Sequence, residues 1–147
     1  MQDPAAQVCD ALRFLVRAGV VDYNGHASAR VDGGFVINTA ASNPAAMTPA
    51  MLCRVGLDGA VIQGDRPPNE VHLHAEIYRA RPDVQAVVHG HPVWLGTLTA
   101  AGGQLMPVLP QGVLVADLAV YPHAHSISTP DRGLRWPPRS GPGAGRC

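Results

Sequence analysis

The stretch PPNEVHLHAEIYRARPDVQAVVHGHP, residues 67–92, decides how this chain folds. Its last part, VVHGHP at 87–92, is typical of an apolar strand that finishes in His-x-His. Side chains at positions i and i+2 of a strand point to the same side, so His89 and His91 can direct two imidazoles at one point. A divalent metal ion needs this geometry, and the motif therefore predicts a pair of metal ligands.

A carboxylate precedes this histidine pair in the sequence. Glu70 and His74 are one helical turn apart on the segment that leads into the strand, which places them on one face of the expected helix. This helix is expected from about Glu70 to Arg79, with Asn69 as its cap. A carboxylate and three imidazoles between residues 70 and 91 predict a metal site with an acid/base group beside it.

The remaining elements alternate between helical and extended patterns. Asp58-Gly59 predicts a hairpin turn between two strands, and Pro92 is typical of a helix start. We expect helices at 5–19 and 92–102, a short helical turn at 47–52, and strands beginning at 20 and covering 34–38, 84–88, 105–109 and 118–121. The pattern is that of a single α/β domain.

The turn at Asn24-Gly25 has two interpretations. Asn-Gly favours a turn because both residues tolerate positive φ, so a plain β-turn before a strand explains it. The alternative is a loop whose backbone N–H groups, together with Ser28 and Arg30, hold an anionic group of a substrate. His26 would then face the same cleft.

Composition excludes several classes of function. The chain has 147 residues, 46% hydrophobic content and a formal net charge of zero, which fits one soluble domain and gives no sign of nucleic-acid or membrane binding. Its three cysteines are far apart with no CxxC pair, so neither a disulfide framework nor a zinc finger is predicted. We expect a cytoplasmic protein.

All eleven basic residues are arginine. Schiff-base chemistry on a carbonyl requires a lysine amine. If this protein makes or breaks bonds next to a carbonyl, a metal ion must polarise that carbonyl instead.

These motifs together resemble the class II aldolase/adducin family. The family's core motif is similar to Glu70-x-x-x-His74, IYRARPDV at 77–84 and VHGHP at 88–92. GHASAR at 25–30 is similar to the family's upstream Gly-x-x-Ser-x-Arg loop, and Thr48-Pro49 to the segment after it. The similarity extends from about residue 12 to residue 133.

The resemblance implies a three-layer αβα fold with a mainly antiparallel central sheet, usually assembled as a homotetramer. Carried over, His89 and His91 are ligands of Zn²⁺ or another divalent metal, and Glu70 is the acid/base. The metal would polarise a carbonyl or hydroxyl of a small-molecule substrate and stabilise the enediolate formed by carbon–carbon cleavage. The family's anion-binding loop would contain Gly25, Ser28 and Arg30.

Two positions indicate which branch of the family is closest. The sugar-phosphate aldolases have serines just before the glutamate and an asparagine after the loop glycine, where this chain has Asn69 and His26. Gly-His-x-Ser is more similar to the branch that decarboxylates hydroxylated aromatic or ring-cleavage acids. We therefore expect His26 and Asn69 at a substrate that is not a phosphorylated sugar.

The family's third zinc histidine follows a Thr-Pro-x-x-Gly segment, which is residues 129–133 here. No histidine follows Gly133, so we expect an incomplete family domain over 1–133 and a disordered Pro/Gly/Arg-rich tail over 134–147. The two histidines at 123 and 125 are interpreted as loop residues.

The leading hypothesis is a metal-dependent lyase, an aldolase or decarboxylase that acts on a small hydroxylated oxo acid. One alternative is a non-catalytic adducin-like module or inactive truncated fragment that keeps the fold. Another is a sugar-phosphate epimerase, because epimerisation uses the same metal-stabilised enediolate.

Overall fold

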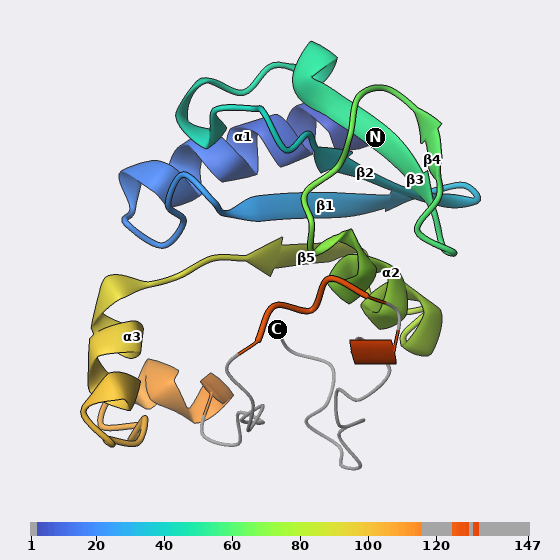
Figure 1. Ribbon diagram of the computed structural model, residues 1–147. Coiled ribbons are helices and arrows are strands. Elements are labelled where there is room, and N and C mark those ends of the chain that lie inside the picture. Colours follow the sequence, from blue (N-terminus) through green and yellow to red (C-terminus); the bar gives the residue numbers. More distant parts are fainter. Residues whose placement is uncertain (1–2, 116–124, 130, 133–147) are drawn as a thin grey trace.

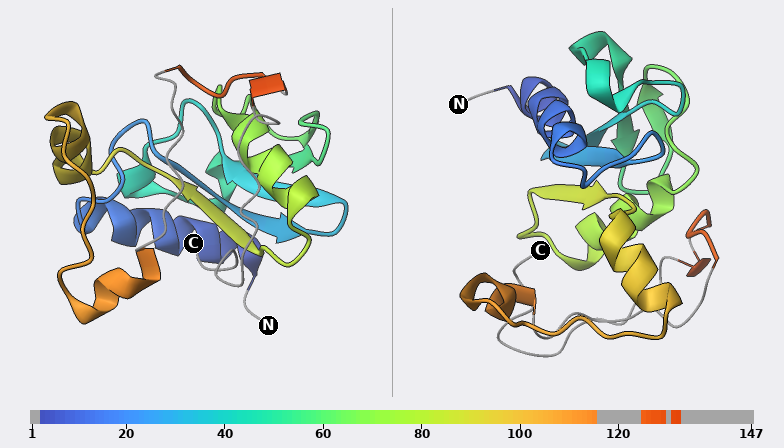
Figure 2. Two further views of the ribbon diagram at one scale, coloured as in Figure 1. Left: turned by 90° about the horizontal axis from the view of Figure 1, so that it is seen from below. Right: turned by 90° about the vertical axis from the view of Figure 1, so that its left-hand side faces the viewer.

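The computed structural model describes residues 3–115, 125–129 and 131–132 (Figure 1). Within these residues, a five-stranded sheet lies between helix α1, Pro4–Arg17, and helix α2, Val71–Ala80. The two helices cover opposite faces of the sheet (Figure 1 and Figure 2). The expected three-layer arrangement is therefore confirmed.

The sheet has the order β4-β3-β2-β1-β5, and every pairing in the described residues is antiparallel. Gly33 and Gly59 make the turns between neighbouring strands, with φ of 73° and 84°. Only glycine adopts such angles without a steric cost. The strands are β1 His26–Val31, β2 Gly34–Asn38, β3 Leu52–Gly56, β4 Val61–Gln63 and β5 Ala86–His89.

Strand β2 shows how the pleat divides the core into two parts. Phe35 and Ile37 are fully buried in the cluster on the α2 face, whereas Val36 between them packs against the cluster on the α1 face. Successive side chains of a strand alternate between the two faces, so one short strand contributes to both clusters. Burying one such large side chain contributes about 1.5–3 kcal/mol.

The residues at its two ends explain where helix α1 begins and where it stops. Asp3 caps it by accepting a hydrogen bond from Ala5 N, and Pro4 occupies the first turn. Gly19, with φ of 69°, follows the last turn. The helix buries Val8, Cys9 and Leu12.

Several expected boundaries are corrected by the structure. Residues 20–25 form a loop rather than a strand, because the N–H groups of Val20 and Val21 bond to Leu15 O and close the end of α1. Helix α2 begins at Val71, and Asn69 does not cap it: its side-chain oxygen accepts from Arg66 instead.

Helix α3, Val93–Ala100, follows Pro92 as expected and continues from β5 away from the sheet (Figure 1).

The expected strand at 105–109 is wrong, since these residues pair with no strand of the described sheet and Pro107 lacks a backbone donor. The 3₁₀ helices are Pro44–Ala46, Pro49–Met51 and Pro110–Val115. The expected strand at 118–121 and the expected tail lie outside the described residues.

In the described part of the chain, no helix combines the length and the apolar character that crossing a membrane requires.

Gly34→Ala is expected to destabilise the sheet. A Cβ at this position would lie 2.0 Å from Val55 O in the neighbouring strand, so β2 and β3 must separate. We expect the free energy of unfolding, measured by urea titration, to fall by about 3 kcal/mol. Gly96→Ala is the matched control: a Cβ there meets nothing within 4 Å, and alanine in α3 should not destabilise. Equal stability of the two variants would contradict the described β2–β3 packing.

Candidate active site

The pleat of β1 directs a row of polar side chains at helix α2. Ala27 and Ala29 belong to the cluster under α1, so His26, Ser28 and Arg30 face α2. Polar residues on one face of a strand usually meet water. Here they are covered, and His26 and Ser28 are each only 2% exposed.

The pairing of β1 with β5 brings two histidines together. His26 lies opposite His89 in the antiparallel register, and their rings stack with centroids 4.5 Å apart and an interplanar angle of 13°. His89 is at the end of β5, so this contact is at the edge of the sheet layer where α2 begins.

Glu70, directly before α2, completes a cluster with these two imidazoles. Its Oε2 is 3.0 Å from His89 Nε2 and 3.4 Å from His26 Nε2. One possible ligand atom from each of the three residues lies within 4.8 Å of the other two. The other carboxylate oxygen, Oε1, accepts a hydrogen bond of 2.9 Å from Ser126 Oγ.

His91 joins the cluster from the other side. Its Nε2 lies 3.1 Å from His89 Nε2, while its Nδ1 faces Asp22 Oδ1 at 3.2 Å. Two imidazole nitrogens bound to a tetrahedral zinc ion at 2.0–2.1 Å would be about 3.4 Å apart. An imidazole whose second nitrogen faces a carboxylate is also the usual arrangement of a metal ligand. The residues present therefore fit a divalent cation.

The ionisation states of His26, His89 and Glu70 also favour the binding of a cation. Burial and the neighbouring His89 lower the pKa of His26 to about 4, and burial lowers the pKa of His89 in spite of Glu70. Burial raises the pKa of Glu70, but the hydrogen bond from Ser126 and the nearby His89 more than offset this and lower it. At neutral pH His26 and His89 are therefore neutral beside an ionised Glu70, and the neutral imidazole is the form of histidine that binds a divalent metal.

His74 lies behind this cluster, fully buried. Its Nε2 is 2.7 Å from His26 Nδ1, and its Nδ1 is 2.7 Å from Ser28 Oγ, which also contacts Tyr78 OH at 2.8 Å. Burial lowers the pKa of His74 well below the usual value. His26 therefore lies between Glu70 and His74, the two residues that the sequence places on one face of the helix.

The predicted substrate contacts of Ser28 and Arg30 are not what the structure contains. Both residues lie inside β1 rather than in a loop, and the Ser28 hydroxyl is enclosed between His74 and Tyr78. Arg30 donates to the carbonyl oxygens of Tyr78, Arg81 and Val84, at the end of α2 and after it. The guanidinium is also 4.6 Å from the Tyr78 ring centre. Both residues hold α2 on the sheet.

A cleft of about 480 Å³ opens beside the cluster. Glu70 and His91 line it, together with the predicted substrate residues Gly25 and Asn69. The predicted substrate residue His26 does not line the cleft: it is buried behind Glu70, with its Nε2 3.4 Å from Glu70 Oε2. The other lining residues of the cleft are mostly polar: Tyr23, Asn24, Asn38, Thr39, Ala40, Ser42, Arg66, Pro68 and Ser126. The cleft can therefore hold a small polar molecule against Glu70.

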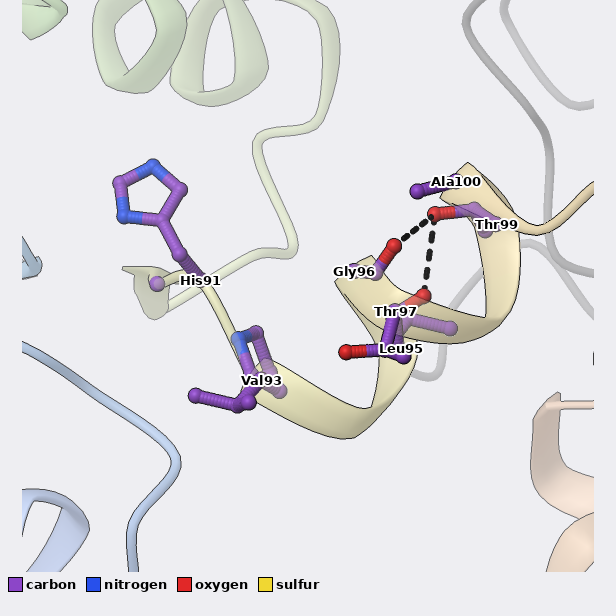
Figure 3. Close-up of a pocket in the computed structure, with 9 residues that line it drawn as sticks. His91, Val93, Leu95, Gly96, Thr97, Thr99 and Ala100 are labelled. Carbon is purple, nitrogen blue, oxygen red and sulfur yellow. Dashed lines mark hydrogen bonds between the residues drawn. The ribbon is translucent and has the colours of Figure 1, made fainter.

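A second cavity, of about 630 Å³, follows α3 from Gly90 to Ala100. The Thr99 hydroxyl there already bonds to the carbonyl oxygens of Leu95 and Gly96, and the His91 ring points away from the helix (Figure 3). This surface offers little to a polar substrate, so we place the site in the smaller cleft.

Three contributors escaped the sequence reasoning: Asp22, Tyr78 and Ser126. Each reaches the site by contacts over long sequence separations, such as 69 positions between Asp22 and His91. Only the polar alternation of β1, with its alanines between polar residues, signals that something polar must lie opposite.

Comparison with known proteins agrees with this arrangement. The model of the Class II Aldolase and Adducin N-terminal domain matches residues 6–133. A 3-oxo-tetronate 4-phosphate decarboxylase of Cupriavidus necator is 37% identical over 97 residues, covering 65% of this chain and 45% of that protein. A 3,4-dihydroxyphthalate decarboxylase of Arthrobacter keyseri is 40% identical, covering 40% of this chain and 31% of that protein.

Comparison with solved structures points to the same family of folds. An L-fuculose 1-phosphate aldolase from Glaciozyma antarctica PI12 superposes with a TM-score of 0.72, covering 90% of this chain and 57% of that chain at 22% identity. The chain spans less than half the length of the two curated relatives.

The buried histidines predict a loss of stability in acid. The folded-state pKa of His74 lies far below the unfolded value of about 6.5, so its contribution is complete above pH 6.5 and is lost as the pH falls. While the folded imidazole stays neutral, each pH unit below 6.5 costs about 1.4 kcal/mol. We expect His74→Gln to reduce the slope of unfolding free energy against pH between 6.5 and 5 by about this amount, measured by denaturant titration of metal-free protein. Between pH 7.5 and 8.5 the two slopes should agree; identical slopes in acid would contradict a buried neutral His74.

Proposed function

The chain belongs to the class II aldolase and adducin family, and from that premise we propose that it is a divalent-metal-dependent lyase for a small hydroxylated oxo acid. The observation that carries the proposal is the convergence of one carboxylate and two imidazoles: Glu70 Oε2 is 3.0 Å from His89 Nε2, which is 3.1 Å from His91 Nε2. The decarboxylases and the aldolase that resemble this chain are lyases.

In this proposal His89 and His91 hold the metal, which we take to be Zn²⁺. When bound, the metal polarises a substrate carbonyl or hydroxyl as a Lewis acid. Glu70 moves the proton: its carboxylate is ionised, its Oε1 is held by Ser126, and its Oε2 faces the ligand pair. It accepts a proton from the substrate hydroxyl, or returns one to carbon after the carbon–carbon bond has broken.

The cleft supports the choice of substrate class. Gly25 and Asn69 line the cleft beside Glu70, and His26 contacts Glu70 Oε2 from behind. His26 and Asn69 stand where the sugar-phosphate aldolases have asparagine and serine, which favours decarboxylation of a hydroxylated acid. We propose this reaction ahead of aldol cleavage and epimerisation.

We also propose a homo-oligomer. The apolar side chains of α3 are at the surface, with Val93 71% and Trp94 86% exposed. Leu95 and Leu98 of the same helix are partly exposed as well, and a contiguous apolar surface is a candidate for contact with a second copy of the chain.

Metal content tests the site directly. Purified, chelator-washed protein that is then supplied with Zn²⁺ should retain near one ion per chain, measured by elemental analysis after gel filtration. His89→Ala/His91→Ala should lose the ion, because both nitrogen ligands are gone, whereas Glu70→Ala should keep it. Absence of bound metal in the unaltered protein would rule out the proposed lyase and favour the non-catalytic adducin-like module.

Glu70→Gln tests the proton-transfer role. The amide has the size of the carboxylate but cannot accept a proton, so carbon dioxide release from 3-oxo and hydroxylated aromatic acids should fall by a factor of about 10²–10⁴. The variant should keep its zinc. Undiminished turnover in Glu70→Gln would exclude Glu70 as the acid/base.

A further inference from the structure

A continuous series of hydrogen bonds runs from the cleft into the layer between the sheet and α2. Glu70 Oε2 is 3.4 Å from His26 Nε2, and His26 Nδ1 is 2.7 Å from His74 Nε2. His74 Nδ1 is 2.7 Å from Ser28 Oγ, which is 2.8 Å from Tyr78 OH. The four inner residues are at most 2% exposed. Because water does not reach these groups, their contacts with one another decide which atom donates each hydrogen bond.

The inner end by itself allows either direction. The Tyr78 hydroxyl lies 2.8 Å from Ser28 Oγ, and each oxygen can donate or accept. The direction must therefore come from the other end of the series.

The outer end allows one direction. A carboxylate only accepts, so His26 Nε2 carries the hydrogen that faces Glu70. A neutral His26 then has a lone pair on Nδ1, which accepts from His74 Nε2–H. This leaves the lone pair of His74 on Nδ1, opposite Ser28. Both imidazoles then carry their hydrogen on Nε2, Ser28 donates to His74 Nδ1, and Tyr78 donates to Ser28 Oγ.

We propose that Tyr78, Ser28, His74 and His26 form a one-directional hydrogen-bond chain whose last N–H holds Glu70 Oε2 in place. The proposal rests on the proposed function, in which Glu70 moves the proton. Ser28, His74 and Tyr78 are positioning residues: they act through His26, and none of them touches the substrate.

The direction of the chain has a consequence for metal binding. His26 lies within the cluster of possible ligand atoms formed with Glu70 and His89. A metal ligand must offer a lone pair, but the Nε2 of His26 offers a hydrogen. His26 is therefore a hydrogen-bond donor to Glu70 and does not replace a third imidazole ligand.

Imidazole ¹⁵N NMR of the metal-free chain tests the proposal without any assay of activity. The two ring nitrogens of a neutral histidine differ in chemical shift according to which one carries hydrogen. His26→Gln and His74→Gln assign the two rings among the seven histidines. We expect both rings to be neutral at pH 7.5 with hydrogen on Nε2. Hydrogen on Nδ1 of either ring, or a charged ring, overturns the proposal.

A pair of His74 variants separates positioning from mere packing. The amide of His74→Gln can still donate to His26 Nδ1 and accept from Ser28, so His26 should keep its hydrogen on Nε2. His74→Leu fills the space but donates nothing, so a second His26 form with hydrogen on Nδ1 should appear. An unchanged His26 in His74→Leu would show that the chain does not set its form; should that variant not fold, the unaltered protein decides.

Addition of Zn²⁺ distinguishes the two proposals. The signals of His89 and His91 should shift while His26 keeps its Nε2 hydrogen. Loss of that hydrogen on zinc addition would make His26 a ligand and overturn the inference, while leaving the lyase proposal intact. Failure to bind zinc would remove the lyase proposal, while the hydrogen positions measured in metal-free protein would stand.

Discussion

The antiparallel pairing of β1 with β5 is the constraint on which the candidate site depends. It sets His26 opposite His89, and the pleat turns both side chains toward the side where α2 begins. Glu70 precedes that helix and meets the two rings there. A slip of one residue in this register would turn His26 and Ser28 to the α1 face and separate the carboxylate from the imidazoles.

The same pairing requires polar groups to be buried. His26, Ser28 and His74 are enclosed between sheet and helix, where each missing partner would cost about 1–3 kcal/mol. The protein meets this requirement by bonding them to one another and to Tyr78. Among the buried side-chain nitrogen and oxygen atoms of the described residues, only Arg54 Nε lacks a partner. The site is thus held by groups that also hold α2 to the sheet.

Sequence reasoning succeeded where structure depends on near neighbours. The helix that buries Leu12 and the glycine turn at 59 follow from local periodicity or from backbone angles that only glycine adopts freely. The expected strand ending in His-x-His is corrected, because β5 ends at His89 and His91 lies beyond it. Sequence reasoning also failed for residues 105–109, whose apolar composition suits a strand but which find no partner strand in the described sheet. A strand is stabilised by its neighbours, and composition alone does not supply them.

The sequence by itself determined the family and the layered fold, because these follow from motif spacing and local pattern. Only the tertiary structure decided what Ser28, His26 and His74 do. Their partners lie 46 to 50 positions away along the chain, and they are chosen by strand register and by the way α2 packs on the sheet. Ser28 looked like a substrate contact in a loop; the pleat of β1 turns it inward, where it can only bond to its buried neighbours.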